Sequence, residues 1–343
     1  MRDDLVRTVD RVFEEHCSKQ VRESAEAGEW PAGLWQALEE VGLTSAALPE
    51  SAGGSGLSFG DAMLALRRTA YHGAPVPLAE TMLGGRMLVA AGLEVPKGAL
   101  TVAPVHVGDR LTLVEGKVSG TASRVPWAPH CGHLVVVAHS GDQQVVALVG
   151  KRSGDRSPEM NLAGEPRVPV QFRGDRVIAS APLANAALRL EAEGALCRSV
   201  QMAGALERTL EYSLQYANER VQFGRAIGKF QAIQHLLAVL AGQVAASSAA
   251  ADAAVEASSG IPDQVMVAVA KARIGEAAGK GFEIAHQVHG AMGYTREHNL
   301  HYVTRRLLAW RDEFGNETHW QTRLGRMVAA KGADALWPML TGG

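Results

Sequence analysis

The sequence changes twice between helical and β-prone patterns, and this order constrains the fold more than any other feature. Up to about residue 95, apolar residues such as Leu34 and Leu38 recur at helical spacing. From about residue 100 to residue 182, short β-prone runs are separated by pairs such as Gly108-Asp109. From Asn185 onward the helical pattern returns. The order predicts a β region inserted between two helical regions.

We expect three regions, which cover residues 1–97, 98–184 and 185–343. The first is predicted to be helical, the second a small antiparallel barrel or sandwich, and the third a bundle of long helices. Helix starts are expected at three places: at Ser58, which with Asp61 resembles a capping box, after Pro77, and at Pro262. The expected strands are Leu111 to Val114, Leu134 to Ala138, Val145 to Val149, Val168 to Phe172 and Val177 to Ala179.

Charge and cysteine content narrow the class of protein. A net charge of -2 gives no electrostatic reason to expect a nucleic-acid or membrane partner. The three cysteines lie far apart, without a C-x-x-C pair, so neither a disulfide framework nor a thiolate zinc site is indicated. No signal-peptide pattern is present, and no apolar run reaches the ~18 residues that a membrane span needs. We therefore expect a cytoplasmic globular protein.

Two glycine-broken junctions between the C-terminal helices carry candidate binding residues. They run from Glu219 to His235 and from Gln287 to Glu297. The forked charge of Arg220 suits bidentate contact with a phosphate, and Gln222 can donate to a phosphate or a ribose. Gln231 lies near the expected start of a helix, where free amides favour an anion. A surface turn with an arginine and a packed phenylalanine has the same residues, and chemistry alone favours that structural interpretation.

The two junctions resemble the C-terminal signatures of the acyl-CoA dehydrogenase flavoproteins. R-x-Q-F-G, continued by x-I-x-x-F-Q-x-x-Q-H, is close to the family pattern, and Q-x-H-G-x-x-G-Y-T-x-E-H follows it. Leu43 to Gly60 resembles an N-terminal family segment. The resemblance implies a helical domain, a β domain and a four-helix bundle, with FAD between the last two and partly held by a neighbouring subunit. It implies FAD contacts for Arg220, Gln222, Phe223, Phe230, Gln231, Gln287 and Gly290.

The family's catalytic base is missing from its expected places. In the family a carboxylate with a raised pKa removes the α proton of a CoA thioester while the flavin accepts the β hydride. The two family positions for this glutamate fall on Phe314 and Gly194. Glu313 and Glu193 stand beside them, but one residue turns a helical side chain by about 100°. A solvated surface carboxylate is the alternative interpretation of each, so the base stays unassigned.

The β region also departs from the family, at Thr101 to Asp109 and at Gly120 to Ala128, where the family has its flavin contacts. The chain thus resembles the smaller subunit of a two-chain acyl-CoA dehydrogenase of steroid degradation. The resemblance implies an FAD-dependent subunit, with an acyl-CoA substrate, electron-transferring flavoprotein and either a homologous chain or a second copy as partners. A non-catalytic subunit that completes a homologue's FAD site is one alternative, and a flavin oxidase or monooxygenase is another.

Three histidine pairs invite a metal interpretation. They are His130 with His133, His286 with His289, and His298 with His301. No cysteine or carboxylate completes any of them at zinc spacing, and His289 lies inside the flavin-type motif. We therefore expect no metal site.

Overall fold

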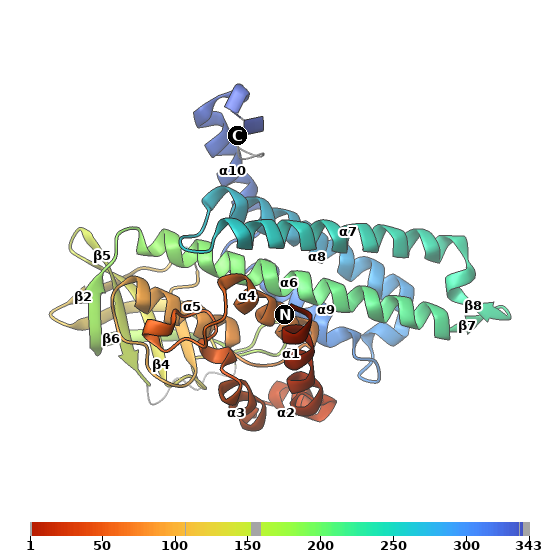
Figure 1. Ribbon diagram of the computed structural model, residues 1–343, viewed down its shortest axis with the longest axis horizontal. Helices are drawn as coiled ribbons and strands as arrows, with labels where there is room; N and C mark the ends of the chain where they lie inside the picture. Colours follow the sequence, from red (N-terminus) through yellow and green to blue (C-terminus); the bar gives the residue numbers. More distant parts are fainter. Residues whose placement is uncertain (1, 107, 152–158, 336, 339–343) are drawn as a thin grey trace.

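The structure is a computed structural model that describes residues 2–106, 108–151, 159–335 and 337–338. Figure 1 shows a β-barrel at one end, a long helical bundle that extends away from it, and a group of N-terminal helices beneath the part of the bundle next to the barrel. This arrangement confirms the predicted fold class of a mainly helical chain with a β-barrel between its helical regions.

The N-terminal helices begin where the sequence signals indicated. The Ser58 Oγ accepts a hydrogen bond from the backbone N–H of Asp61 at 3.1 Å, which caps the helix that follows. The helix expected after Pro77 begins at Leu78. The five helices are α1 (Arg2–His16), α2 (Lys19–Glu26), α3 (Ala32–Glu40), α4 (Phe59–Tyr71) and α5 (Leu78–Ala90), with short 3-10 helices at Leu43–Ser45 and Glu50–Ala52.

In the described part of the chain, six strands form the barrel. In order along the sheet they are β1 (Leu100–Ala103), β4 (His133–Ser140), β2 (Leu111–Val114), β3 (Lys117–Pro126), β6 (Arg167–Pro182) and β5 (Gln143–Gly150). An additional pairing of β4 with β5 closes the sheet on itself. Alternate side chains, among them Val118, Val136 and Phe172, form an apolar core inside it.

The strand predictions need three corrections. β1 and β3 were not predicted, and β1 pairs in parallel with β4, so the barrel is not wholly antiparallel. The two strands predicted on either side of Gly174 are one strand, β6. Gly174 has a φ of +78°, and the pairing of β3 with β6 shifts register beside it. A glycine can take this left-handed conformation, so the strand bends there without ending.

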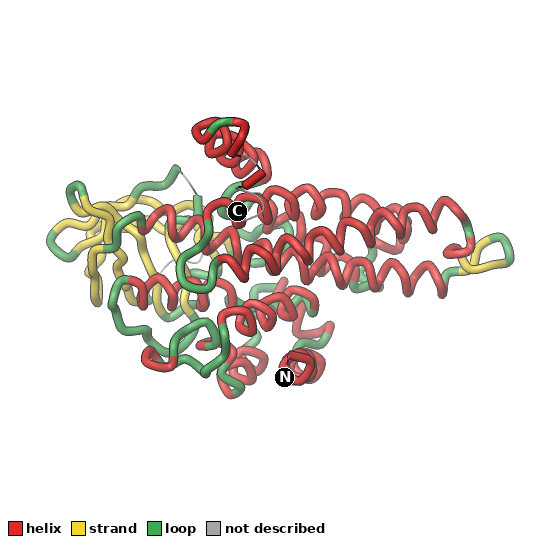
Figure 2. Tube along the Cα trace, turned by 45° about the horizontal axis from the view of Figure 1, so that its top comes forward, coloured by secondary structure: helices red, strands yellow, loops and turns green. Residues whose placement is uncertain are grey.

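The C-terminal bundle consists of α6 (Ala186–Glu219), α7 (Gln231–Ala257), α8 (Gln264–His289) and α9 (Leu300–Arg311). Figures 1 and 2 show α6, α7 and α8 running side by side, and α10 (Glu317–Lys331) projecting from the body. Pro262 lies just outside α8, because the Asp263 side chain caps that helix by accepting from the N–H groups of Val265 and Met266. Three 3-10 helices, Ile227–Lys229, Gly290–Tyr294 and Ala333–Ala335, complete the region.

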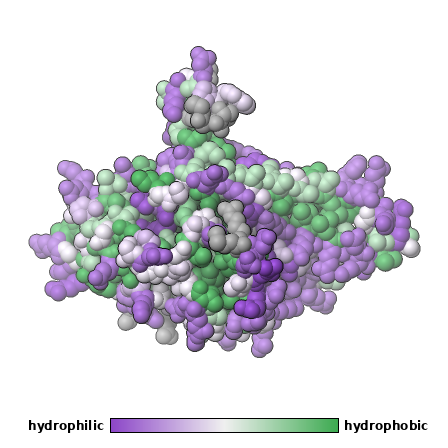
Figure 3. Space-filling model, in the orientation of Figure 1, coloured by the Kyte–Doolittle hydropathy of each residue, from purple (hydrophilic) through white to green (hydrophobic). Residues whose placement is uncertain are grey.

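Helix α7 has an unusually apolar exposed face. Alanines, Gly242 and the half-exposed Val239 lie on it, and apolar residues are visible over this part of the surface in Figure 3. Among the described residues α7 is long and apolar enough to cross a bilayer by length and composition, a test that core helices also pass. The expectation that no apolar stretch reaches that length therefore missed α7, whose alanines give a high mean hydropathy.

Candidate functional site

The first junction forms a small hairpin at the far tip of the bundle, where α6 ends and α7 begins (Figures 1 and 2). Its strands are β7 (Val221–Gln222) and β8 (Arg225–Ala226). At the turn, Phe223 and Gly224 both have positive φ angles, of +51° and +80°. The Phe223 side chain is 93% exposed. Such exposure of a phenylalanine held in a strained turn is typical of a contact made by another molecule.

The other residues with predicted FAD contacts also face outward. Arg220, Gln222, Gln231 and Gln287 are exposed, as is Gly290, whose positive φ of +57° ends α8. Phe230 is half-buried, and its ring meets that of Phe223 edge to face at 6.2 Å. Because α8 runs antiparallel to α7, both junctions lie at the same end of the bundle (Figure 1). The described residues around the hairpin form a projecting contact surface, without an enclosing wall of their own.

The two positions that the resemblance predicts for the base meet at one point in this chain. Gly194 lies on α6, and the buried Phe314 lies in the loop between α9 and α10. A Cβ atom built on Gly194 would lie 2.4 Å from two ring carbons of Phe314. The ring therefore fills the space that the missing Gly194 side chain leaves open. No carboxylate of this chain can enter that space while the ring is there.

Glu313, the carboxylate beside Phe314, is fully engaged in ion pairs. The Arg167 Nε donates to its Oε1 at 2.7 Å, and the Arg198 Nε donates to its Oε2 at 2.8 Å. Burial alone would raise the pKa of Glu313, but the two guanidinium groups lower it to about 2. A general base that works near neutral pH needs a pKa close to that pH. The pairing therefore favours a structural role for Glu313, as the counter-ion of Arg167 and Arg198.

Glu193 of α6, the carboxylate beside Gly194, is also paired with two arginines. Its Oε2 accepts from the Arg86 Nε at 2.8 Å, and its Oε1 accepts from the Arg189 Nε at 2.8 Å. The side chain is buried. Both carboxylates that stand next to the expected base positions are thus bound to arginines in this chain.

Glu313 belongs to a larger buried ion cluster that joins the three regions. Arg198 also pairs with Glu80 of α5, and Arg167 also pairs with Glu165 at 3.0 Å. Three carboxylates face three guanidinium groups, since Arg306 of α9 pairs with Glu165 at 3.1 Å. The cluster was not predicted from the sequence, although charged residues at positions of an apolar helical pattern, such as Glu80 and Arg198, are a signal for it.

Backbone contacts hold the loop that carries Phe314. The fully buried Lys271 of α8 donates from Nζ to the carbonyl oxygens of Arg311 and Gly315, both at 2.7 Å. The Trp320 Nε1 donates to the Phe314 carbonyl at 2.9 Å. Burial lowers the pKa of Lys271 to about 7, and even a neutral amine has two hydrogens for these two acceptors. The positive φ of +54° at Phe314 is therefore fixed from several sides.

A cavity of about 220 Å³ separates this loop from the barrel. Arg124, which like Phe314 has a φ of +54°, lines it together with Val105 and Arg167. Its volume is below the roughly 300 Å³ at which sites for ligands of drug size begin. The cavity beside this loop is therefore small, whereas the exposed hairpin carries the arginine and glutamine side chains that suit phosphate and ribose contacts.

The histidine pairs lie in aromatic surroundings. The His289 ring stacks on Tyr216 with centroids 4.5 Å apart, and His298 meets Tyr212 edge to face. Burial lowers the pKa of His289 to about 4. In the part of the chain that the structure describes, no group of three or more His, Cys, Asp or Glu side chains is placed to hold a metal ion.

Comparisons with known proteins agree with the geometry. The family model "Acyl-CoA dehydrogenase, C-terminal domain" matches residues 185–322, and "Acyl-CoA dehydrogenase, N-terminal domain" matches residues 2–99. The chain is 28% identical over 312 residues to "Acyl-CoA dehydrogenase IpdE2" of Mycolicibacterium smegmatis, which covers 89% of this chain and 91% of the relative. It is 30% identical over 315 residues to "Acyl-CoA dehydrogenase FadE34" of Mycobacterium tuberculosis, which covers 87% of this chain and 42% of the relative.

Solved structures are similar over nearly the whole chain. The "Tcur3481-Tcur3483 steroid ACAD G363A variant" has a TM-score of 0.85 at 25% identity and covers 96% of this chain and 98% of its own. A chain of the "ChsE4-ChsE5 complex from Mycobacterium tuberculosis" has a TM-score of 0.84 at 25% identity and covers 97% of this chain and 98% of its own.

Proposed function

The chain belongs to the acyl-CoA dehydrogenase family of FAD-dependent flavoproteins, and we propose that it is the non-catalytic subunit of a heteromeric acyl-CoA dehydrogenase. In this role it completes the FAD site of a homologous chain, which carries out the dehydrogenation of the CoA thioester. The observation that carries the proposal is the packing of Phe314 against Gly194, because it closes both positions from which the family's base acts.

The hairpin is the part of this chain that would hold the cofactor. Arg220 would pair with the pyrophosphate of FAD, and Gln222 would donate to a phosphate or ribose oxygen. The exposed Phe223 ring would pack on an apolar surface of the partner or the cofactor. When bound, FAD supplies the hydride acceptor of the reaction. The residues of this chain orient one end of it, and the proton chemistry belongs to the other chain.

The comparisons support the heteromeric form of the proposal. One similar structure is the ChsE4-ChsE5 complex, and the other is the Tcur3481-Tcur3483 steroid ACAD, so both carry the names of two chains. By extension we propose a steroid-type or other bulky acyl-CoA substrate on the partner chain, and electron-transferring flavoprotein as electron acceptor. Cys17, Cys131 and Cys197 are buried and free, which supports a reducing compartment such as the cytoplasm.

Self-sufficient catalysis is the competing interpretation. It would need Glu313 or Glu193 to leave its arginine partners and reach the point that the Phe314 ring occupies. Removing one member of a buried ion pair typically costs about 3–5 kcal/mol. The oxidase or monooxygenase alternative explains the missing base equally, but no contact in the described residues favours it over a subunit role.

Purification alone and together with a co-expressed homologue tests the proposal. We expect the lone chain to carry no stoichiometric flavin, and the complex to show a flavin absorption spectrum that acyl-CoA substrates bleach. Bleaching of the complex should survive Glu313→Gln in this chain, provided that the variant still assembles. A lone chain that binds FAD in a 1:1 ratio and is bleached by an acyl-CoA would overturn the subunit role.

A further inference from the structure

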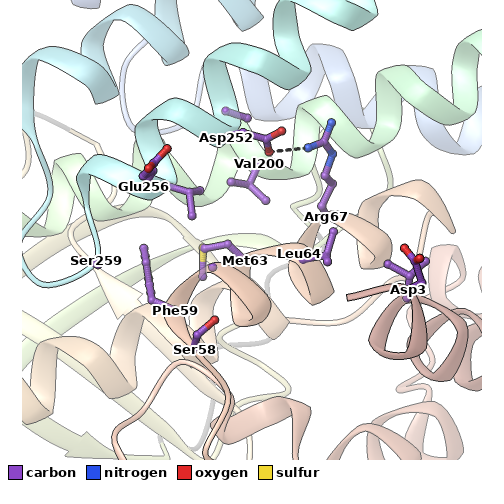
Figure 4. Close-up of a pocket in the computed structure, with 14 residues that line it drawn as sticks. Asp3, Ser58, Phe59, Met63, Leu64, Arg67, Val200, Asp252, Glu256 and Ser259 are labelled. Atoms are coloured by element: carbon purple, nitrogen blue, oxygen red, sulfur yellow. Dashed lines mark hydrogen bonds and ion pairs between the residues drawn. The ribbon is translucent and has the colours of Figure 1, made fainter. Parts of the chain in front are cut away.

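A second cavity, of about 690 Å³, lies between α1, α4, α6 and α7 (Figure 4). Its volume falls within the range of roughly 300–1,000 Å³ that is typical of small-molecule sites. Val200 of α6 lines it, six residues after Gly194, which places the two residues about 120° apart around the helix. The cavity therefore opens on another face of α6 than the contact with Phe314, and the proposed subunit role does not use it.

The cavity has an apolar floor. Met63 and Val200 are each 2% exposed, and Ala251 lies beside them on α7. Partly buried Leu64 and Val255 form the walls above this floor. A floor of this kind favours an aliphatic or alicyclic body, because each buried CH₂ group contributes about 0.8 kcal/mol.

The charges at the rim are predominantly negative. Asp3 of α1 and Asp252 and Glu256 of α7 are exposed residues of the lining, and Figure 4 shows the α7 pair above the floor and Asp3 at one end. Arg67 is the basic residue of the lining. The cavity thus has three carboxylates and one guanidinium group. Of the two α7 carboxylates, Asp252 pairs with Arg67, and Glu256 is exposed.

The positive charge of Arg67 is already neutralised within the protein. Its Nη1 donates to Asp252 at 2.9 Å, and its Nη2 donates to Glu207 at 2.5 Å. Arg67 is 8% exposed and the Glu207 side chain 29%, so water screens this pair less than the pair with Asp252, whose side chain is 72% exposed. The guanidinium group is therefore a poor anchor for an anion. Its buried Nε–H has no acceptor among the described residues and is available to a neutral ligand oxygen or a water molecule.

From this combination we infer that the cavity is a binding site for a small amphipathic cation, a molecule with an apolar body and an amine that is protonated at neutral pH. The body would lie on Met63 and Val200, and the ammonium group would lie near Glu256 and Asp252. A carboxylate of the same shape is repelled by the rim, and the phosphates of coenzyme A are repelled more strongly.

Three probes of equal length test the charge preference: n-octylammonium, 1-octanol and octanoate. Each probe is titrated calorimetrically into the full chain, or into the complex where the chain co-purifies with a partner. We expect octylammonium to bind one equivalent roughly fivefold or more tightly than octanol, since each exposed charge pair contributes a few tenths to 1 kcal/mol. Octanoate should bind more weakly than octanol. Coenzyme A should not displace octylammonium.

Matched variants locate the site. Glu256→Lys should reverse the order of octylammonium and octanoate, and Leu64→Trp should weaken all three probes by filling the cavity. Glu276→Lys places the same change on an exposed position of α8 outside the lining, and the order should then stay as in the native chain. Octanoate binding as tightly as octylammonium, an unchanged order in Glu256→Lys, or an absence of binding by all three probes would each overturn the inference.

Discussion

Gly194 and Phe314 pack directly against each other, and this contact accounts for the glycine at position 194. A glycine in the interior of a helix costs about 1 kcal/mol relative to alanine, so its presence in the buried part of α6 calls for a packing reason. The Phe314 ring supplies that reason, because no side chain larger than hydrogen fits beneath it. The ring in turn is held at a positive φ by the contacts of its loop.

Alanine substitutions of Gly194 and Phe314, singly and together, test the contact. Gly194→Ala should destabilise the isolated chain by about 1–3 kcal/mol through overpacking, despite the gain in helix propensity. Phe314→Ala should cost about 3–5 kcal/mol. In the double variant the added methyl group occupies space that the ring has vacated, so the cost should be clearly below the sum of the two single costs. Urea unfolding of all four chains measures this coupling.

Gly242→Ala is the matched control. Gly242 also lies in the interior of a long helix, but a Cβ atom added there meets no described atom within 4 Å. The isolated chain should therefore gain up to about 1 kcal/mol from the helix propensity of alanine. Additive costs for Gly194→Ala and Phe314→Ala would mean that the ring does not fill this space in solution.

At the scale of elements, the hairpin of β7 and β8 is suited to interact with something outside the chain. The Phe223 ring is 93% exposed and makes its ring contact with Phe230 at 6.2 Å. Phe223→Ala should therefore leave the unfolding free energy of the isolated chain within about 0.5 kcal/mol of the native value. In a complex with a homologue the same change should weaken assembly or FAD retention about tenfold or more, because buried aromatic anchors dominate interfaces.

Ile178→Ala is the control for the hairpin prediction. Ile178 is 60% exposed on β6 of the barrel. Its substitution by alanine therefore also removes an exposed apolar side chain, at a position outside the hairpin. Analytical ultracentrifugation and the ratio of flavin to protein absorbance report assembly and FAD retention. Equal effects of Phe223→Ala and Ile178→Ala on both quantities would argue against a special role of the hairpin.

The elements also show what the sequence can and cannot predict here. The start of α4 follows from Ser58 and the start of α5 from Pro77, because capping is a local property. The continuity of β6 through Gly174 and the parallel pairing of β1 depend on distant strands, and the local pattern does not contain them. Likewise, the motif residues of the hairpin were identified by their resemblance to a family motif that is continuous in the sequence, whereas the partners of Glu313 come from β6 and α6.

At the scale of the whole molecule, the buried ion cluster ties the N-terminal helices, the barrel and the bundle together. Glu80 comes from α5, Arg167 from β6, Arg198 from α6 and Glu313 from the loop after α9. All four side chains are at most 5% exposed. Loss of the Glu313 carboxylate therefore removes one of the two carboxylate partners of Arg167 and one of the two of Arg198. We expect the three regions to unfold together as long as the cluster is intact.

Glu313→Gln should lower the unfolding free energy at pH 7 by about 3–5 kcal/mol. The folded-state pKa of Glu313 is about 2, below its usual 4.5, so the stabilisation by its charge is present above pH 4.5 and is lost as the pH falls toward 2. The difference in unfolding free energy between the native chain and the variant should accordingly shrink between pH 6 and pH 3.

Glu276→Gln, on an exposed face of α8, is the control and should differ little from the native chain in unfolding free energy at any of these pH values. Urea titrations at several pH values measure all three chains, and a difference that stays constant from pH 6 to pH 3 would show that Glu313 is not held as an ion-paired carboxylate.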